Sequence, residues 1–244
     1  MQDIKTNFNK IKKKKDPELI NDFLINISNQ PSSEHFEYID YFINNLKPEV
    51  IEKIKINLIY SIGELAKIHK IDVEYINYLI EQYFISDRWI RNEIIVALNK
   101  ISINFELSNE IVDFISKTLN EDYISIKINA IKLLEKCKTI PNTSYKNIFR
   151  SLNTAEKEMM EPISKILNKE IKDENKLFDV LNLTENYKVL NKKSIRIILF
   201  NCINNLPNLE NFKNLISKSE WNEKEKNLFL KEINDYERII FKKF

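Results

Sequence analysis

A stripe of apolar residues recurs along this chain at a nearly constant spacing. In residues 87–101 the stripe falls on one face of a helix with 3.6 residues per turn, and it consists of Ile90, Ile94, Ala97, Leu98 and Ile101. The pattern occurs seven times, and successive copies start 34, 36, 36, 33, 36 and 34 residues apart. The seven starting residues are Ile20, Ile54, Ile90, Ile126, Met159, Ile195 and Phe229.

Shorter amphipathic segments lie between these helices, and their spacing sets the expected architecture. We expect helices at about residues 72–84, 107–119, 143–152, 174–184 and 208–218. One helical pair cannot bury its apolar face alone, so a two-helix unit repeated every 33–36 residues is typical of a solenoid. The only glycine is Gly63, and hairpin turns and phosphate-binding loops both need glycine. The sequence therefore predicts an all-α fold.

The helix over residues 87–101 resembles the second helix of a HEAT repeat, in which a turn aspartate precedes an aliphatic-basic pair. Asp87, Ile90 and Arg91 carry this resemblance, and residues 122–137 repeat it. It implies an α-solenoid of about six HEAT-like helical hairpins, wound as a right-handed superhelix with the second helices on the concave face. Three of the seven copies depart from the pattern: Met160 and Leu230 stand where the basic residue is expected, and the copy at Ile20, which has Asn21 there, is weaker still. The TPR repeat has a similar period but relies on a glycine and aromatic spacing that this chain lacks.

The charge is unevenly distributed along the chain. The formal net charge is +2, whereas residues 1–15 carry six lysines against Asp3, a balance of 6 − 1 = +5. We expect residues 1–15 to be a flexible basic arm, because adjacent lysines repel one another. Residues 16–244 are expected to form a single domain. The arm offers weak attraction to acidic lipid or nucleic acid through Lys10, Lys12, Lys13, Lys14 and Lys15.

The sequence favours a cytoplasmic protein without a metal or cofactor. Cys137 and Cys202 fall at apolar helix positions, as reduced buried thiols do, and no segment has the length of a membrane span. His35 and His69 lie far apart on polar stretches, have no metal-ligand spacing, and are expected at the surface. No catalytic motif accompanies them, so we expect no enzyme activity.

The candidate binding surface is the face of the second helices opposite the apolar stripe, where a neutral, partly apolar groove is expected. A protein or peptide partner is the leading hypothesis, and no oligomeric state is indicated. The predicted partner-binding residues are Ile56, Tyr60, Gly63, Asn92, Val96, Asn99, Ile128, Lys132, Glu135, Ile197, Asn201 and Asn204.

The alternative is a helical-repeat nucleic-acid-binding protein or a DNA glycosylase-like enzyme. Such a protein needs a basic cleft, but Lys132 and Lys165 on the candidate surface are balanced by Glu135 and Glu161. Asp87 beside Trp89 is the nearest approach to a catalytic carboxylate with an aromatic neighbour, and a helix cap explains it equally well. Trp89 and Trp221 both lie at the entry to a second helix, and each ring is expected to pack there and close the end of a helix pair.

Overall fold

The computed structural model describes residues 4–206 and 208–241, which form fourteen α-helices and five short 3-10 helices with no strand among them. The prediction of an all-α fold is confirmed. The chain divides into two compact units, Met1–Glu106 and Leu107–Phe244, and each is described by itself. The single domain expected over residues 16–244 stays a prediction.

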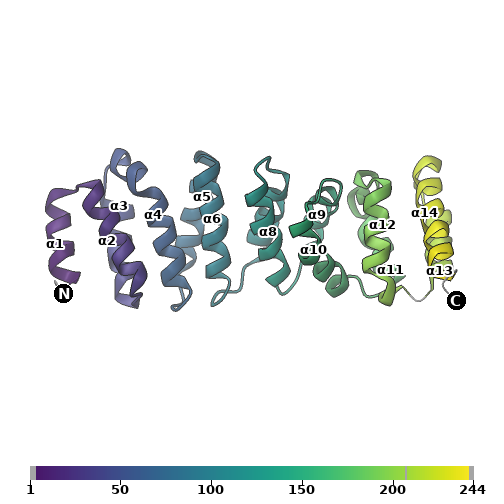
Figure 1. Cartoon of the computed structure of the whole chain (residues 1–244), viewed down its shortest axis with the longest axis horizontal. Helices are drawn as coiled ribbons and strands as arrows, with labels where there is room; N and C mark the ends of the chain where they lie inside the picture. The colour runs from purple at the N-terminus through teal and green to yellow at the C-terminus, as the bar shows by residue number, and fades with distance from the viewer. Residues whose placement is uncertain (1–3, 207, 242–244) are drawn as a thin grey trace. The chain divides into compact units, whose positions relative to one another are not determined.

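Unit 1 alternates first and second helices of successive pairs (Figure 1). Its second helices lie side by side, because α4 packs against both α2 and α6. The first helices α3 and α5 pack on α4 and α6 respectively. The bounds are α1 (Ile4–Lys14), α2 (Pro17–Asn29), α3 (Phe36–Asn45), α4 (Pro48–Ala66), α5 (Val73–Ile85) and α6 (Arg88–Ile101), with a 3-10 turn at Ser33–His35.

Unit 2 has the same alternation. The second helices α8, α10, α12 and α14 contact one another in that order, and the first helices pair as α7 with α9 and α11 with α13. The bounds are α7 (Asn109–Lys117), α8 (Ile124–Lys136), α9 (Tyr145–Leu152), α10 (Lys157–Glu170), α11 (Glu174–Asn182), α12 (Lys192–Asn201), α13 (Leu209–Lys218) and α14 (Glu223–Phe241). Its 3-10 turns are Thr118–Asn120, Asn142–Ser144, Leu183–Val189 and Ile203–Asn205.

The second helices begin where the sequence supplies a cap. Asp87 Oδ1 accepts hydrogen bonds from the backbone N–H groups of Trp89 and Ile90, at 2.9 and 3.0 Å. Asp16 caps α2 in the same way, and Pro17 occupies the first helical position, where its missing N–H costs no hydrogen bond. Asp87 is thus engaged as a helix cap, which accounts for it without a catalytic role.

The apolar stripe forms the core of both units. Every expected stripe residue of α4, α8 and α10 is buried, and in α6 only Ile90, at the start of the helix, is half-buried. The helical spacing of the apolar residues in the sequence therefore predicted the core of these helices correctly. Buried stripe residues include Leu58, Ile62 and Leu65 in α4, Ala130, Leu133 and Leu134 in α8, and Ile163, Ile166 and Leu167 in α10.

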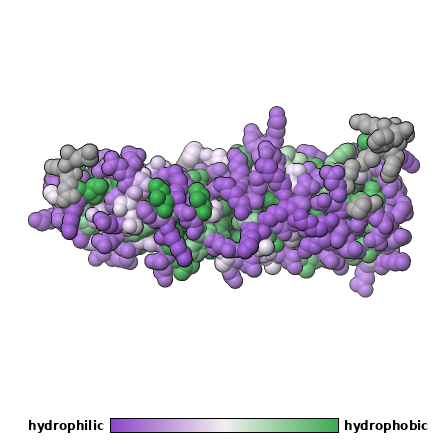
Figure 2. All heavy atoms as spheres, turned by 90° about the horizontal axis from the view of Figure 1, so that it is seen from below, coloured by the Kyte–Doolittle hydropathy of each residue, from purple (hydrophilic) through white to green (hydrophobic). Residues whose placement is uncertain are grey.

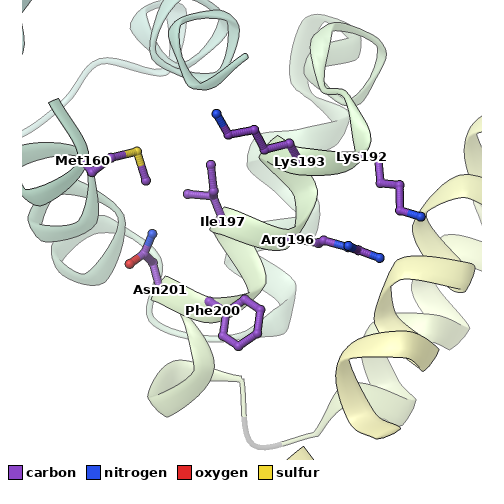
Figure 3. Close-up of a pocket in the computed structure, with 7 residues that line it drawn as sticks. All are labelled: Met160, Lys192, Lys193, Arg196, Ile197, Phe200 and Asn201. Carbon is purple, nitrogen blue, oxygen red and sulfur yellow. The ribbon is translucent and has the colours of Figure 1, made fainter. Parts of the chain in front are cut away.

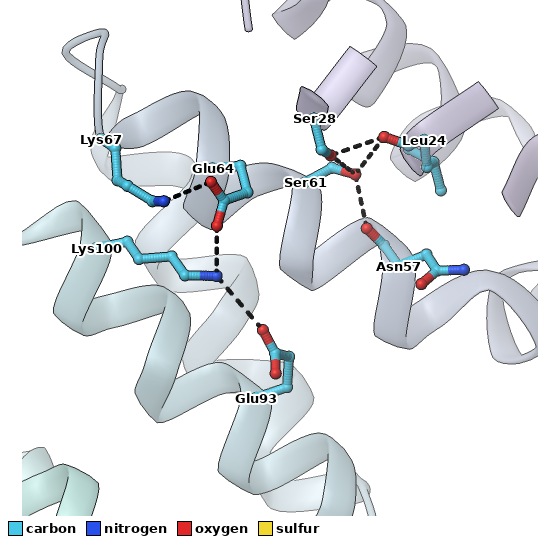
Figure 4. A network of polar contacts seen from close by, with 8 residues as sticks. All are labelled: Leu24, Ser28, Asn57, Ser61, Glu64, Lys67, Glu93 and Lys100. Atoms are coloured by element: carbon cyan, nitrogen blue, oxygen red, sulfur yellow. Dashed lines mark hydrogen bonds and ion pairs between the residues drawn. The ribbon is translucent and has the colours of Figure 1, made fainter. Parts of the chain in front are cut away.

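Contacts between neighbouring second helices recur one repeat apart. Ser28 Oγ donates to Ser61 Oγ at 2.8 Å (Figure 4). Asn57 Nδ2 donates to Asn21 Oδ1 at 2.9 Å. In unit 2 Ser164 Oγ donates to Asn201 Oδ1 at 2.7 Å. These pairs are 33, 36 and 37 residues apart, so each joins equivalent parts of successive helices.

The N-terminal segment is helical rather than flexible. Residues 4–14 form α1, and its Phe8 is 6% exposed and lies against the rings of Phe23, Tyr38 and Phe42. Ile11 is buried as well. The expectation of a flexible arm over residues 1–15 was wrong for this part, because Phe8 and Ile11 supply enough apolar surface to hold the helix despite the lysines. Residues 1–3 of the expected arm lie outside the described residues.

Two expectations about aromatic side chains were wrong. His35 is 6% exposed and stacks on Tyr38, with ring centroids 5.8 Å apart, instead of lying at the surface. Trp89 leaves 54% of its surface exposed, whereas Trp221 is 3% exposed and stacks on Tyr187 at 4.2 Å as expected.

The burial of His35 predicts that unit 1 loses stability on mild acidification. Burial disfavours the charged imidazolium and lowers the pKa of His35 below 6.5, although a backbone hydrogen bond with Ile27 opposes this. The unfolded chain therefore takes up the proton first, so this contribution is complete above the unfolded pKa and is lost as the pH falls below it. Urea denaturation from pH 7 to about 5 measures the loss. A His35→Phe variant is expected to flatten the slope, and an unchanged slope would assign the pH dependence to other groups.

α4 and α6 approach closely at Gly63. A Cβ atom added there would lie 3.0 Å from the backbone Cα of Ala97 and from Lys100 Cδ. Gly63→Leu is therefore expected to force the helices apart and to destabilise unit 1 by about 2–3 kcal/mol in urea denaturation. Gly63→Ala is the control, since its gain in helix propensity of up to about 1 kcal/mol offsets part of the strain. Unchanged stability in Gly63→Leu would show that the helices tolerate a wider separation.

Both cysteines are free and buried, as expected. Burial raises the pKa of Cys137 to about 11 and that of Cys202 to about 12, so both thiols are unreactive at neutral pH. Across the described helices, none combines the length and the apolar character needed to cross a membrane.

Candidate functional site

The predicted binding residues lie mostly on the solvent side of the second helices, which we call the second-helix surface. In unit 1, Ile56 is 45% exposed, and Asn92, Val96 and Asn99 are half-buried. In unit 2, Ile128, Glu135, Ile197 and Asn201 are half-buried, and Lys132 and Asn204 are exposed. Asn204 lies in the 3-10 turn after α12 rather than on the helix. Whether these residues bind a partner stays a prediction.

Gly63 must be removed from the predicted binding residues. It is buried, and the space beside it is filled by Ala97 and Lys100 of α6. The glycine permits close packing of two helices and leaves no slot for a ligand. The position of Gly63 in the sequence is compatible with either role, close packing of helices or a slot for a ligand.

Several other predicted residues are engaged by a neighbouring second helix. Lys100 Nζ lies 4.3 Å from the centre of the Tyr60 ring, a cation–π arrangement. Glu135 Oε1 lies 3.1 Å from Lys165 Nζ, and Asn201 accepts the hydrogen bond from Ser164. Contacts between helices thus occupy part of the surface that the sequence assigned to a partner.

A charged cluster crosses from α4 to α6 on the second-helix surface of unit 1 (Figure 4). Glu64 lies 2.6 Å from Lys67 Nζ and 2.9 Å from Lys100 Nζ. Partial burial raises the pKa of Glu64, but the hydrogen bonds from the two lysines outweigh it and hold the pKa below its usual value. Burial raises the pKa of Glu93. Lys100 Nζ lies 3.8 Å from Glu93 Oε1 and offsets this rise only in part. Because the charges are paired within the cluster, it serves to join the two helices.

A pocket of about 550 Å³ opens between α10 and α12. Met160 extends from α10 towards Ile197 and Lys193 of α12, whereas Lys192 and Arg196 point towards α14 (Figure 3). The remaining lining residues are Phe200 and Asn201. The sequence predicted Ile197 and Asn201 here and missed Met160, Lys192, Lys193, Arg196 and Phe200.

The pocket coincides with irregularities in the repeat. Met160 stands where Lys55, Arg91 and Arg196 occupy the equivalent place, so a neutral side chain faces α12. Phe200 is 50% exposed, although Ile59 at the equivalent position is fully buried. Pro162 lies inside α10 and removes one backbone donor from that helix. The sequence carries this signal in the positions where one repeat differs from the others, whereas the shared stripe does not include them.

A buried carboxylate supports the far side of the pocket. Glu232 of α14 is fully buried, and Arg196 Nε donates to its Oε2. Lys192 Nζ lies 3.3 Å from the other oxygen of Glu232, and Asp235 is 3.8 Å from Arg196. These contacts neutralise Lys192 and Arg196. Lys193, which is exposed, makes no ion pair with any residue in the described part of the chain, so it is the cation available at the pocket.

Other chemistry is sparse on the described surface. Among residues 4–206 and 208–241, no group of three or more His, Cys, Asp and Glu side chains is placed to hold a metal ion. The face of the molecule in Figure 2 is mostly hydrophilic, with hydrophobic atoms in small separate patches. The pocket between α10 and α12 therefore offers the clearest combination of apolar lining and available charge.

Comparison with known proteins adds no relative: no family model, no curated protein and no solved structure matches this chain.

Proposed function

We propose that this chain is a HEAT-like α-solenoid of helical hairpins, wound as a right-handed superhelix, and a non-enzymatic scaffold that binds a protein or peptide on its second-helix surface. The regular spacing of the stripe supports the repeat assignment, as do the contacts one repeat apart within each unit. The two buried free thiols fit a cytoplasmic setting.

The observation that carries the binding proposal is the pocket between α10 and α12. Its volume lies in the range of ligand-binding clefts, about 300–1,000 Å³. Met160, Ile197 and Phe200 offer apolar contact, and Lys193 offers a charge to fix orientation. An apolar contact surrounded by polar groups is the usual arrangement at the centre of a protein interface.

Site-specific photo-crosslinking tests this proposal. A photoreactive residue at Ile197, introduced in the native cell, is expected to capture a discrete partner. The same residue at Ile239, which is 50% exposed on α14, is the matched control and is expected not to capture it. With the purified partner, Ile197→Glu should weaken binding by about 2 kcal/mol while circular dichroism stays unchanged. Equal capture at Ile197 and Ile239 would contradict the assignment.

Duplex DNA distinguishes this proposal from the nucleic-acid alternative. We expect weak binding at about 0.15 M salt, confined to the lysines of α1. Tight binding that falls steeply with salt and survives Lys12→Gln, Lys13→Gln, Lys14→Gln and Lys15→Gln together would favour a nucleic-acid-binding protein instead.

A further inference from the structure

One edge of unit 1 carries all the turns that join a first helix to its second helix. Because α2, α4 and α6 lie side by side, the α1–α2, α3–α4 and α5–α6 turns lie at the same end of the unit (Figure 1). Lys15 Nζ donates to the backbone carbonyl of Asn45 at 3.4 Å, which joins the first two turns directly. We call residues 12–16, 45–49 and 84–89 the turn edge.

Three large apolar side chains protrude from the α5–α6 turn. Phe84 is 72% exposed and Ile85 is 71% exposed, more than any other large apolar residue in the described chain. Trp89, four residues later, is 54% exposed, and the guanidinium of Arg88 lies 5.1 Å from its ring centre. The other two turns have no comparable group. Clustered apolar exposure of this kind marks an interaction surface.

The turn edge also gathers positive charge. Its exposed cations are Lys12, Lys13, Lys14, Lys15, Lys47 and Arg88, and its carboxylates are Asp16, Glu49 and Asp87. Glu18 of α2 lies just beyond it. Asp16 and Asp87 already accept backbone N–H groups at the starts of α2 and α6. The edge therefore presents a net positive charge of 6 − 3 = +3, or +2 with Glu18.

We propose that the turn edge of unit 1 docks onto the surface of an anionic lipid bilayer. Phe84, Ile85 and Trp89 insert at the level of the headgroups, and the lysines of the α1–α2 turn face lipid phosphates. Tryptophan is enriched at membrane–water interfaces, and an arginine beside it can keep its charged group among the headgroups. Stable attachment takes an apolar and an electrostatic contribution together, and both occur on this edge. These side chains protrude from the turn and form no concave site, so they are better placed to insert into a bilayer than to enclose a small ligand. This docking uses no residue of the second-helix surface, so it is independent of the proposed function.

Vesicle flotation with the full chain tests the proposal. The protein is expected to bind vesicles of about one part phosphatidylserine to three parts phosphatidylcholine at about 0.1 M salt, and to bind phosphatidylcholine alone at least about tenfold more weakly. Phe84→Glu with Ile85→Glu should reduce binding to the anionic vesicles at least about tenfold. The matched control places the same two charges at Ile68 and Ile103, each 60% exposed and lying just after α4 and α6, and should keep binding within about twofold.

Tryptophan fluorescence locates the contact. Trp89 is exposed and Trp221 is buried, so a blue shift on addition of anionic vesicles is expected to come from Trp89. Trp89→Phe should remove the shift while most of the binding remains. No binding to anionic vesicles, or equal binding by the Phe84→Glu/Ile85→Glu variant and its control, would overturn the proposal. So would self-association in sedimentation that this variant alone abolishes, because the turn edge would then be an interface between copies of the chain.

Discussion

Replacing Ala97 by glutamate is expected to unfold unit 1, whereas the same change at the adjacent Val96 should leave it folded. Ala97 is fully buried on α6 and lies directly against Gly63 of α4. A carboxylate there would be buried without a partner, which costs several kcal/mol out of a total stability of about 5–15 kcal/mol. Val96 is half-buried, and a side chain there can turn towards solvent. Thermal denaturation followed by circular dichroism measures both effects.

The Val96→Glu variant also tests whether Val96 lies on the solvent side of α6, opposite the apolar stripe. Its expected cost is below about 1 kcal/mol, as for other surface substitutions. A loss comparable with that of Ala97→Glu would mean that Val96 lies in a contact between helices. The half-buried residues of the second-helix surface would then belong to the core and would no longer be binding candidates.

Removal of Arg196 is expected to destabilise unit 2 far more than removal of its partner Glu232. Glu232 is fully buried, so Arg196→Met leaves a buried carboxylate with Lys192 as its remaining close cation. Breaking a buried pair in this way costs about 3–5 kcal/mol. Glu232→Met instead leaves two cations whose side chains are 43% and 51% exposed and can turn into water. Its expected cost is below about 1 kcal/mol.

The double variant completes this comparison. Arg196→Met combined with Glu232→Met should regain most of the stability lost in Arg196→Met alone, as measured by urea denaturation of each variant. If Glu232→Met proved as costly as Arg196→Met, the ion pair would make a large net contribution to stability. A double variant no more stable than Arg196→Met would show that the arginine acts through its packing instead.

The periodic part of the fold could be predicted from the sequence, because burial on a helix follows local spacing. Ile94, Ala97 and Leu98 share a face whatever surrounds them, and all three are buried. Docking of α1 could not be predicted in the same way. It depends on the rings of Phe23 and Phe42 gathering around Phe8, which brings together residues up to 34 positions apart.

The candidate site was harder to predict than the core. Ile197 and Asn201 were predicted as surface residues because helical periodicity shows which residues lie opposite the apolar stripe. Met160 and Phe200 were missed because they define the pocket by differing from their equivalents in other repeats. Gly63 was placed on the surface because the sequence did not reveal how closely α6 approaches it. Periodicity therefore identifies a face, whereas the distance between neighbouring helices decides which parts of that face stay open.

The contacts one repeat apart bear on how each unit folds and opens. Ser28 meets Ser61 and Ser164 meets Asn201, so these contacts between second helices close loops of similar length wherever they lie in a unit. Relative contact order stays low in such a chain, and folding can begin at any helix pair and spread to its neighbours. Opening of unit 1 should likewise start at its N-terminal end, where the short helix α1 packs on α2. Amide hydrogen exchange is then expected to slow from α2 to α4, within a unit that still melts as a whole.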